Sequence, residues 1–180
     1  MDKISQLEID TRGIDSRFGL IQLSNFSRPV TNLAADSLEA LARYRFILPP
    51  EADRQVKLEA QLENSLTISH PSGGITLTDW KHYRSEWQTL QRLDKVEFAG
   101  PRFADGEEGR FPSVTTKEIH QILNKHPERS ESVLRQAENC TTAMTFPCSV
   151  NASLVRVRLM YRQGNDWSIL HEIRFDLPPP

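Results

Sequence analysis

The sequence predicts an α+β fold, with a mostly antiparallel sheet built from hairpins and three to four helices packed on one face. Hairpins are predicted for residues 56–78 and 154–176, where apolar and polar residues alternate on both sides of a turn. Helices are predicted for residues 34–43, 79–93, 116–126 and 131–138. Hairpins join strands that are neighbours in the sequence, which favours an antiparallel sheet with helices on one side.

The chain of 180 residues has the length of one ordinary domain. Residues 1–30 have weak periodicity and many polar residues, so we expect a polar N-terminal arm that is at most partly ordered. The run from Leu20 to Leu23 within it is typical of a short strand. Residues 31–180 are expected to form a single α+β domain.

Residues 56–68 fit two patterns. Apolar residues occupy six of the seven even positions, and only Asn64 breaks the alternation that a strand requires. Leu58, Leu62 and Leu66 are also four residues apart, a spacing that fits a helix. The longer alternation favours a strand, and a helix is the alternative.

The clearest predicted helix covers residues 79–93. Its apolar residues recur with helical spacing, at Trp80, Tyr83, Trp87 and Leu90. Such a helix presents a large aromatic face, and we expect that face to anchor the core.

The other predicted helices depend on composition and on caps. Residues 34–43 are rich in good helix formers. Thr115 and Glu118 form the sequence signature of a capping box at the start of the helix 116–126. A further helix is predicted for residues 131–138.

The register of the last hairpin follows from its apolar residues. A two-residue loop, Gly164–Asn165, would place Glu172 opposite Val157 on the apolar face. A three-residue loop, 163–165, keeps that face apolar, with Asn165 in the left-handed conformation that such a loop needs. It pairs Tyr161 with Trp167, Leu159 with Ile169, Val157 with His171 and Val155 with Ile173.

Arginines on the other face of this hairpin are a candidate anion or nucleic-acid site. In the predicted register Arg156 faces Glu172, and an ion pair occupies it. Arg158, Arg162 and Arg174 remain for phosphate contacts. The alternative is an ordinary solvated face, which the near-neutral net charge of −2 favours.

The glycine-rich, charged segment 100–113 is the most prominent predicted loop. Its glycines match neither a phosphate-binding loop nor a dinucleotide fingerprint. The pairs Arg102–Phe103 and Arg110–Phe111 combine cationic and aromatic side chains, which are frequent anchors in protein interfaces. The composition favours an ordinary mobile surface loop, and the functional alternative is a partner-binding loop anchored by these two pairs.

No metal or cofactor site is predicted. The chain has no His-x-x-x-His or Cys-x-x-Cys spacing, and Cys140 and Cys148 are expected to be reduced. His171 falls on the apolar face of the last hairpin, where a hydrogen-bonded core histidine is expected. The alternative role for His171 is that of a general base in a sheet-lined pocket.

Three functions are compatible with this sequence. The first is a non-enzymatic interaction or assembly protein, such as a viral or phage structural or accessory component, that self-associates through a sheet edge or the N-terminal arm. The second is nucleic-acid binding by the arginine face, and the third is a small enzyme using His171. Without an export signal or an apolar run of about 20 residues, we expect a cytoplasmic or nuclear location and no membrane span.

Overall fold

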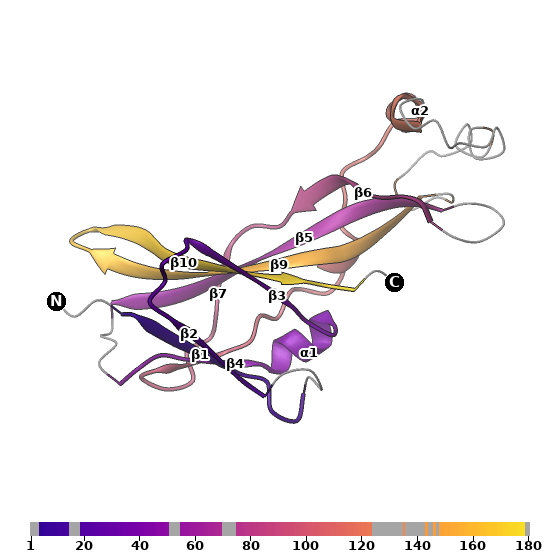
Figure 1. Cartoon of the computed structure of the whole chain (residues 1–180). Coiled ribbons are helices and arrows are strands. Elements are labelled where there is room, and N and C mark those ends of the chain that lie inside the picture. The colour runs from indigo at the N-terminus through magenta and orange to yellow at the C-terminus, as the bar shows by residue number, and fades with distance from the viewer. Residues whose placement is uncertain are drawn as a thin grey trace. The chain divides into compact units, whose positions relative to one another are not determined.

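The computed structural model describes residues 4–14, 19–50, 55–69, 75–123, 135, 143, 146 and 148–178. Strands make up 52% of the described residues and α-helices 11%, so the fold is mostly β (Figure 1). The predicted α+β fold, with three to four helices packed on one face of a sheet, is therefore wrong. The described part of the chain contains two short α-helices.

The strands are β1 (Gln6–Asp10), β2 (Leu20–Ser24), β3 (Val30–Ala34), β4 (Arg45–Ile47), β5 (Val56–Ser69), β6 (Ile75–Arg84), β7 (Gln88–Thr89), β8 (Glu97–Ala99), β9 (Cys148–Gln163) and β10 (Asp166–Asp176). The helices are α1 (Leu38–Arg43) and α2 (Thr116–Leu123), and a 3-10 turn, η1, covers Glu107–Gly109.

The strands form two sheets. One sheet has the order β2-β1-β4-β8, and the other has the order β3-β10-β9-β5-β6, with β7 also paired to β5. Strand β3 runs parallel to β10, whereas the other registered pairs are antiparallel. No helix in the described part of the chain is long and apolar enough to cross a membrane.

The chain divides into two compact units. Unit 1 consists of residues 1–62, 85–104 and 154–178, and unit 2 consists of residues 63–84, 105–153 and 179–180. Strands β5 and β9 contribute residues to both. The segment 1–30, expected to be a polar arm, contains β1 and β2 of unit 1, and Leu7 and Ile9 of β1 are fully buried.

The core of unit 1 lies between its two sheets. Phe46 of β4 and Phe175 of β10 meet edge to face with their ring centroids 6.2 Å apart, and Tyr44 meets Phe175 at 6.1 Å. All three aromatic residues are fully buried. Since burying one such side chain stabilises a fold by roughly 1.5–3 kcal/mol, this cluster is a main source of stability for unit 1.

Unit 2 has a smaller aliphatic core. Its buried members are Leu66, Ile68, Val114, Ile119, Ala143, Cys148 and Val150, with Phe111 packed against them. Helix α2 supplies Ile119, and the predicted capping box at its start is confirmed. The Thr115 N–H donates to a Glu118 carboxylate oxygen at 2.9 Å, and the Glu118 N–H donates to the Thr115 hydroxyl at 3.2 Å.

The predicted helix at 79–93 is wrong. Residues up to Arg84 belong to β6, which pairs antiparallel with β5, and residues 88–89 form β7. The contacts of β6 alternate as in a strand. Lys81 and Tyr83 contact Glu118 and Phe111, whereas His82 and Arg84 contact Glu63.

The other predicted helices have mixed outcomes. The helix expected at 34–43 begins later, at Leu38, because β3 continues to Ala34 and Ser37 provides the N-cap. The helix expected at 116–126 is confirmed as α2, which is described as far as Leu123. The helix expected at 131–138 lies outside the described residues, apart from Arg135.

Both predicted hairpins are confirmed, and residues 56–68 lie in a strand, β5. The predicted register of the last hairpin is wrong. Gln163 pairs with Asp166 across a two-residue turn, and Trp167 then pairs with Arg162. The left-handed residue of the turn is Gly164, with φ of 64°, and not Asn165. Glycine at the first position is what a type II′ turn requires.

A β-bulge explains how this turn is compatible with an apolar core. The register shifts between Ile169 and His171, so that beyond Leu170 Ile173 pairs with Val157 and Phe175 pairs with Val155. The extra residue restores apolar pairs that an uninterrupted two-residue hairpin would lose. Consequently Glu172 faces Arg158, and not Arg156 as predicted.

Candidate functional site

The predicted arginine site lies on the outer face of the β9–β10 hairpin in unit 1. Arg158 is already engaged there. Its guanidinium bonds the Glu59 carboxylate at 2.6 and 2.7 Å and lies 3.9 Å from the ring centroid of Trp87. The pKa of Glu59 is lowered, because the hydrogen bonds and charges of Lys57 and Arg158 together outweigh desolvation by burial, the largest single effect.

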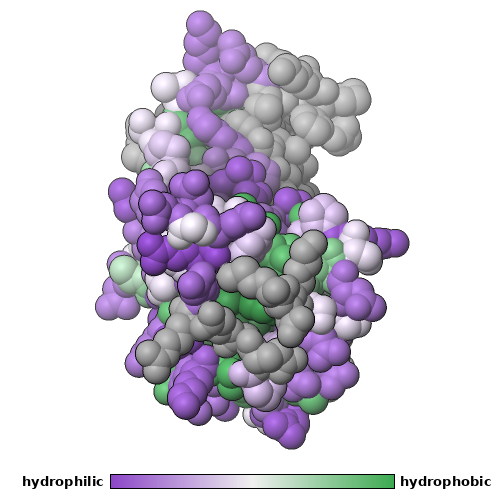
Figure 2. All heavy atoms as spheres, turned by 90° about the vertical axis from the view of Figure 1, so that its left-hand side faces the viewer, coloured by the Kyte–Doolittle hydropathy of each residue, from purple (hydrophilic) through white to green (hydrophobic). Residues whose placement is uncertain are grey.

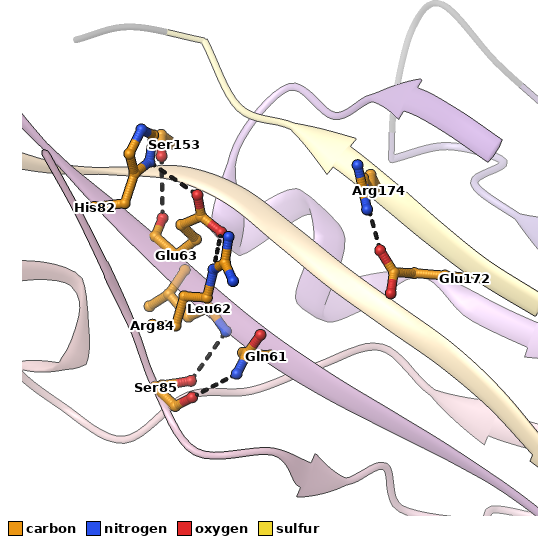
Figure 3. A network of polar contacts seen from close by, with 9 residues as sticks. All are labelled: Gln61, Leu62, Glu63, His82, Arg84, Ser85, Ser153, Glu172 and Arg174. Carbon is orange, nitrogen blue, oxygen red and sulfur yellow. Dashed lines mark hydrogen bonds and ion pairs between the residues drawn. The ribbon is translucent and has the colours of Figure 1, made fainter. Parts of the chain in front are cut away.

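The other two arginines differ from each other. Arg174 bonds Glu172 on its own strand at 2.7 Å (Figure 3). Arg162 is exposed and donates to the Gly164 carbonyl at 3.1 Å, with no ion pair to any described carboxylate. Two of the three arginines are thus neutralised locally, which leaves Arg162 as the main unpaired charge of the predicted set.

The predicted partner-binding loop is divided between the two units. In unit 2, Arg110 forms an ion pair with Glu107 at 2.9 Å, and Phe111 packs against the core. The buried amide of Asn64 donates to the carbonyls of Glu107 and Arg110, which fixes this part of the loop to β5.

In unit 1, Arg102 is exposed, and its carbonyl accepts a hydrogen bond from Gln88 at 2.9 Å. Phe103 is half-buried. The structure therefore does not bring the two pairs into a single set of anchors within one unit.

His171 lies in the core of unit 1. It is 2% exposed, its Nε2 lies 2.9 Å from the Thr31 hydroxyl, and Phe26 stacks on its ring with centroids 4.7 Å apart. Phe26 has a φ of 27°, a rare backbone conformation for an aromatic residue. Burial lowers the pKa of His171 despite the opposing effects of the Arg28 backbone and the Glu172 carboxylate.

A charged cluster in unit 2 was not found by sequence reasoning. The side chain of Glu63 is 6% exposed and lies between His82, at 2.8 Å, and Arg84, at 2.8 Å (Figure 3). The sequence did contain a sign of this cluster. Polar residues alternate with apolar ones along β5, and Glu63 is one of these polar residues and pairs with Arg84. The cluster neutralises a buried carboxylate, as a buried charge requires.

Metal-binding geometry is absent from the described residues, where no three His, Cys, Asp or Glu side chains are placed to hold an ion. Cys148 is buried in unit 2, and Cys140 lies outside the described ranges.

The tip of the last hairpin carries the exposed apolar residues that the sequence pattern assigned to the core. Trp167 is 38% exposed and Ile169 is 53% exposed. Lys57 lies 4.6 Å over the Trp167 ring, which places Trp167 on the outer face with the Lys57–Glu59–Arg158 group. Figure 2 looks onto the side of the molecule where this hairpin ends, and the described surface on that side is mostly hydrophilic with smaller hydrophobic areas.

The same part of β10 has an open edge. Strand β3 pairs with β10 only from Glu172 to Asp176, and no described strand pairs with Trp167–Ile169 on that side. The open edge, defined here as residues 166–170, therefore combines unpaired backbone with two exposed apolar side chains.

No family model, curated protein or solved structure matches this chain.

Proposed function

We propose that this chain is a non-enzymatic protein-interaction or assembly protein that binds an extended protein segment along the open edge of β10. The observation that carries the proposal is the coincidence of an unpaired strand with the exposed side chains of Trp167 and Ile169. In strand addition, main-chain hydrogen bonds supply affinity and alternate side chains supply specificity.

The surroundings of the edge support the same function. Proteins normally protect an open edge with lysine, proline or a bulge. Here the bulge at Leu170 lies at the inner end of the open edge, whereas Trp167 and Ile169 precede it. Aromatic residues are also enriched in protein interfaces.

Nucleic-acid binding is less well supported, since Arg158 and Arg174 already bond carboxylates. A cytoplasmic or nuclear location accompanies the proposal.

Selection from a random-peptide library tests this function. Peptides would be selected on the native chain and counter-selected on an Ile169→Lys variant, whose added charge opposes strand addition. We expect binders with alternating apolar residues that lose at least roughly tenfold in affinity on Ile169→Lys. Leu93→Lys is the matched control, because Leu93 is 44% exposed and lies outside β10. A library without binders sensitive to Ile169→Lys would contradict the proposal.

A further inference from the structure

We propose that the segment bound at the open edge is β10 of a second copy of this chain, paired antiparallel about a twofold axis at Ser168. The inference rests on the proposed function and names its partner. It depends on the direction of the backbone groups, on the length of the edge and on the order of its side chains.

The backbone groups of Trp167 and Ile169 point away from β9. The Arg162 N–H donates to the Gln55 carbonyl at 2.8 Å, so it is not available to Trp167, the partner of Arg162 on β10. In an antiparallel pair, residues that do not bond each other turn their N–H and C=O groups outward. Trp167 therefore presents both groups to the open edge, and Ile169, two residues further, does the same.

The length of the edge matches a self-paired strand. It is bounded by the turn at Gly164–Asn165 and by the first residue paired to β3, Glu172. A twofold axis at Ser168 pairs residues 166–170 of one copy with 170–166 of the other. Trp167 of each copy then exchanges both backbone hydrogen bonds with Ile169 of the second copy.

The side chains are self-complementary in this register. Each Trp167 lies beside Ile169 of the second copy, and each pair covers apolar surface that is exposed in one chain. Asp166 faces Leu170 and Ser168 faces Ser168, so no like charges are opposed. A second copy therefore satisfies the edge without any further partner, and closed twofold pairing uses the same patch on both chains.

The axis residue provides a direct test. Ser168 directs its own backbone groups toward β9, so the two Ser168 residues form a non-hydrogen-bonded pair with Cα atoms about 4.5 Å apart, within the range that a disulfide spans. Oxidising the Ser168→Cys variant should give a reducible covalent dimer in at least roughly tenfold higher yield than the native chain. The yield should fall by a similar factor when Ile169→Lys is added, because an ammonium group opposes apolar contact.

The matched control is Ser24→Cys at the end of β2, which is also the outermost strand of a sheet. Oxidation of the native chain, which contains Cys140 and Cys148, gives the background yield of covalent dimer. Light scattering should show a native dimer that Ile169→Lys dissociates and Leu93→Lys preserves. Cross-linking of Ser168→Cys no greater than that of Ser24→Cys, or a native chain that stays monomeric, would overturn the inference. If the inference fails but library peptides still bind in an Ile169-dependent way, the proposed binding of an extended segment stands without self-pairing. If the peptides do not bind in that way either, the proposed function and the self-pairing both fail.

Discussion

The two halves of β10 differ sharply although they belong to one continuous strand. From His171 to Phe175 the odd-numbered residues are buried, and β10 is paired on both sides from Glu172 onward. In Asp166–Ile169 the odd-numbered residues Trp167 and Ile169 are exposed, and the strand is paired only to β9. The bulge at Leu170 separates the halves. One extra residue moves side chains to the opposite face, so a single strand serves both core and surface.

The largest expected difference between the halves is in stability. Phe175→Ala should lower the free energy of unfolding by about 3–5 kcal/mol, because it leaves a cavity between two aromatic neighbours. Ile169→Ala should change it by no more than about 0.5–1 kcal/mol, because Ile169 is 53% exposed. Urea unfolding of the two variants measures both values. Equal losses would show that the tip is as much a part of the core as Phe175.

The turn should matter less than the core. Gly164 has φ of 64°, and an alanine there adopts a left-handed conformation at a cost of roughly 1–2 kcal/mol. Asn165→Ala is the control, since Asn165 has no positive φ, and its effect should stay within about 0.5 kcal/mol. The same urea titrations measure both. A Gly164→Ala variant as stable as the native chain would contradict the assigned turn.

The smallest expected effect is a pH dependence of the unfolding free energy that arises from His171, the residue directly after the bulge at Leu170. Because burial lowers the pKa of His171 in the folded state, the unfolded chain binds the proton first. The contribution of His171 to the free energy of unfolding is complete above its unfolded-state pKa of about 6.5, and it decreases as the pH falls below that value.

His171→Gln isolates this effect. Between pH 7.5 and pH 5 the native chain should lose more unfolding free energy than the variant, which shares every other titrating group. A parallel pH dependence in the two proteins would show that His171 does not titrate differently on folding.

The sequence predicted local pairing better than it predicted the fold class. Alternation identified β5 and both hairpins, because each depends on neighbouring residues and a turn. The spacing of Trp80, Tyr83, Trp87 and Leu90 suggested a helix, yet these residues span β6 and the segment that pairs through β7. Hydrogen bonds to β5 determined the structure there, and helical spacing alone carries no information about a distant strand.

The candidate site was beyond sequence reasoning for a related reason. All odd positions from Trp167 to Phe175 are apolar or histidine, so an uninterrupted strand places them on one face. Only the bulge at Leu170 reveals that Trp167 and Ile169 face outward. Likewise, Arg158 bonds Glu59 from a different strand, β5, and Arg174 bonds Glu172, which the predicted register had assigned to Arg156.

The parallel pairing of β3 with β10 has a consequence for the order of folding. Thr31 and His171, which bond each other, are 140 residues apart in the sequence. Contacts between such distant segments require closure of a long loop and slow the folding of β proteins. During synthesis β3 is translated before β10, and the whole chain between the two strands must be made before they can pair. We therefore expect unit 1 to complete its second sheet only after translation of β10, with the edge of β3 unpaired until then.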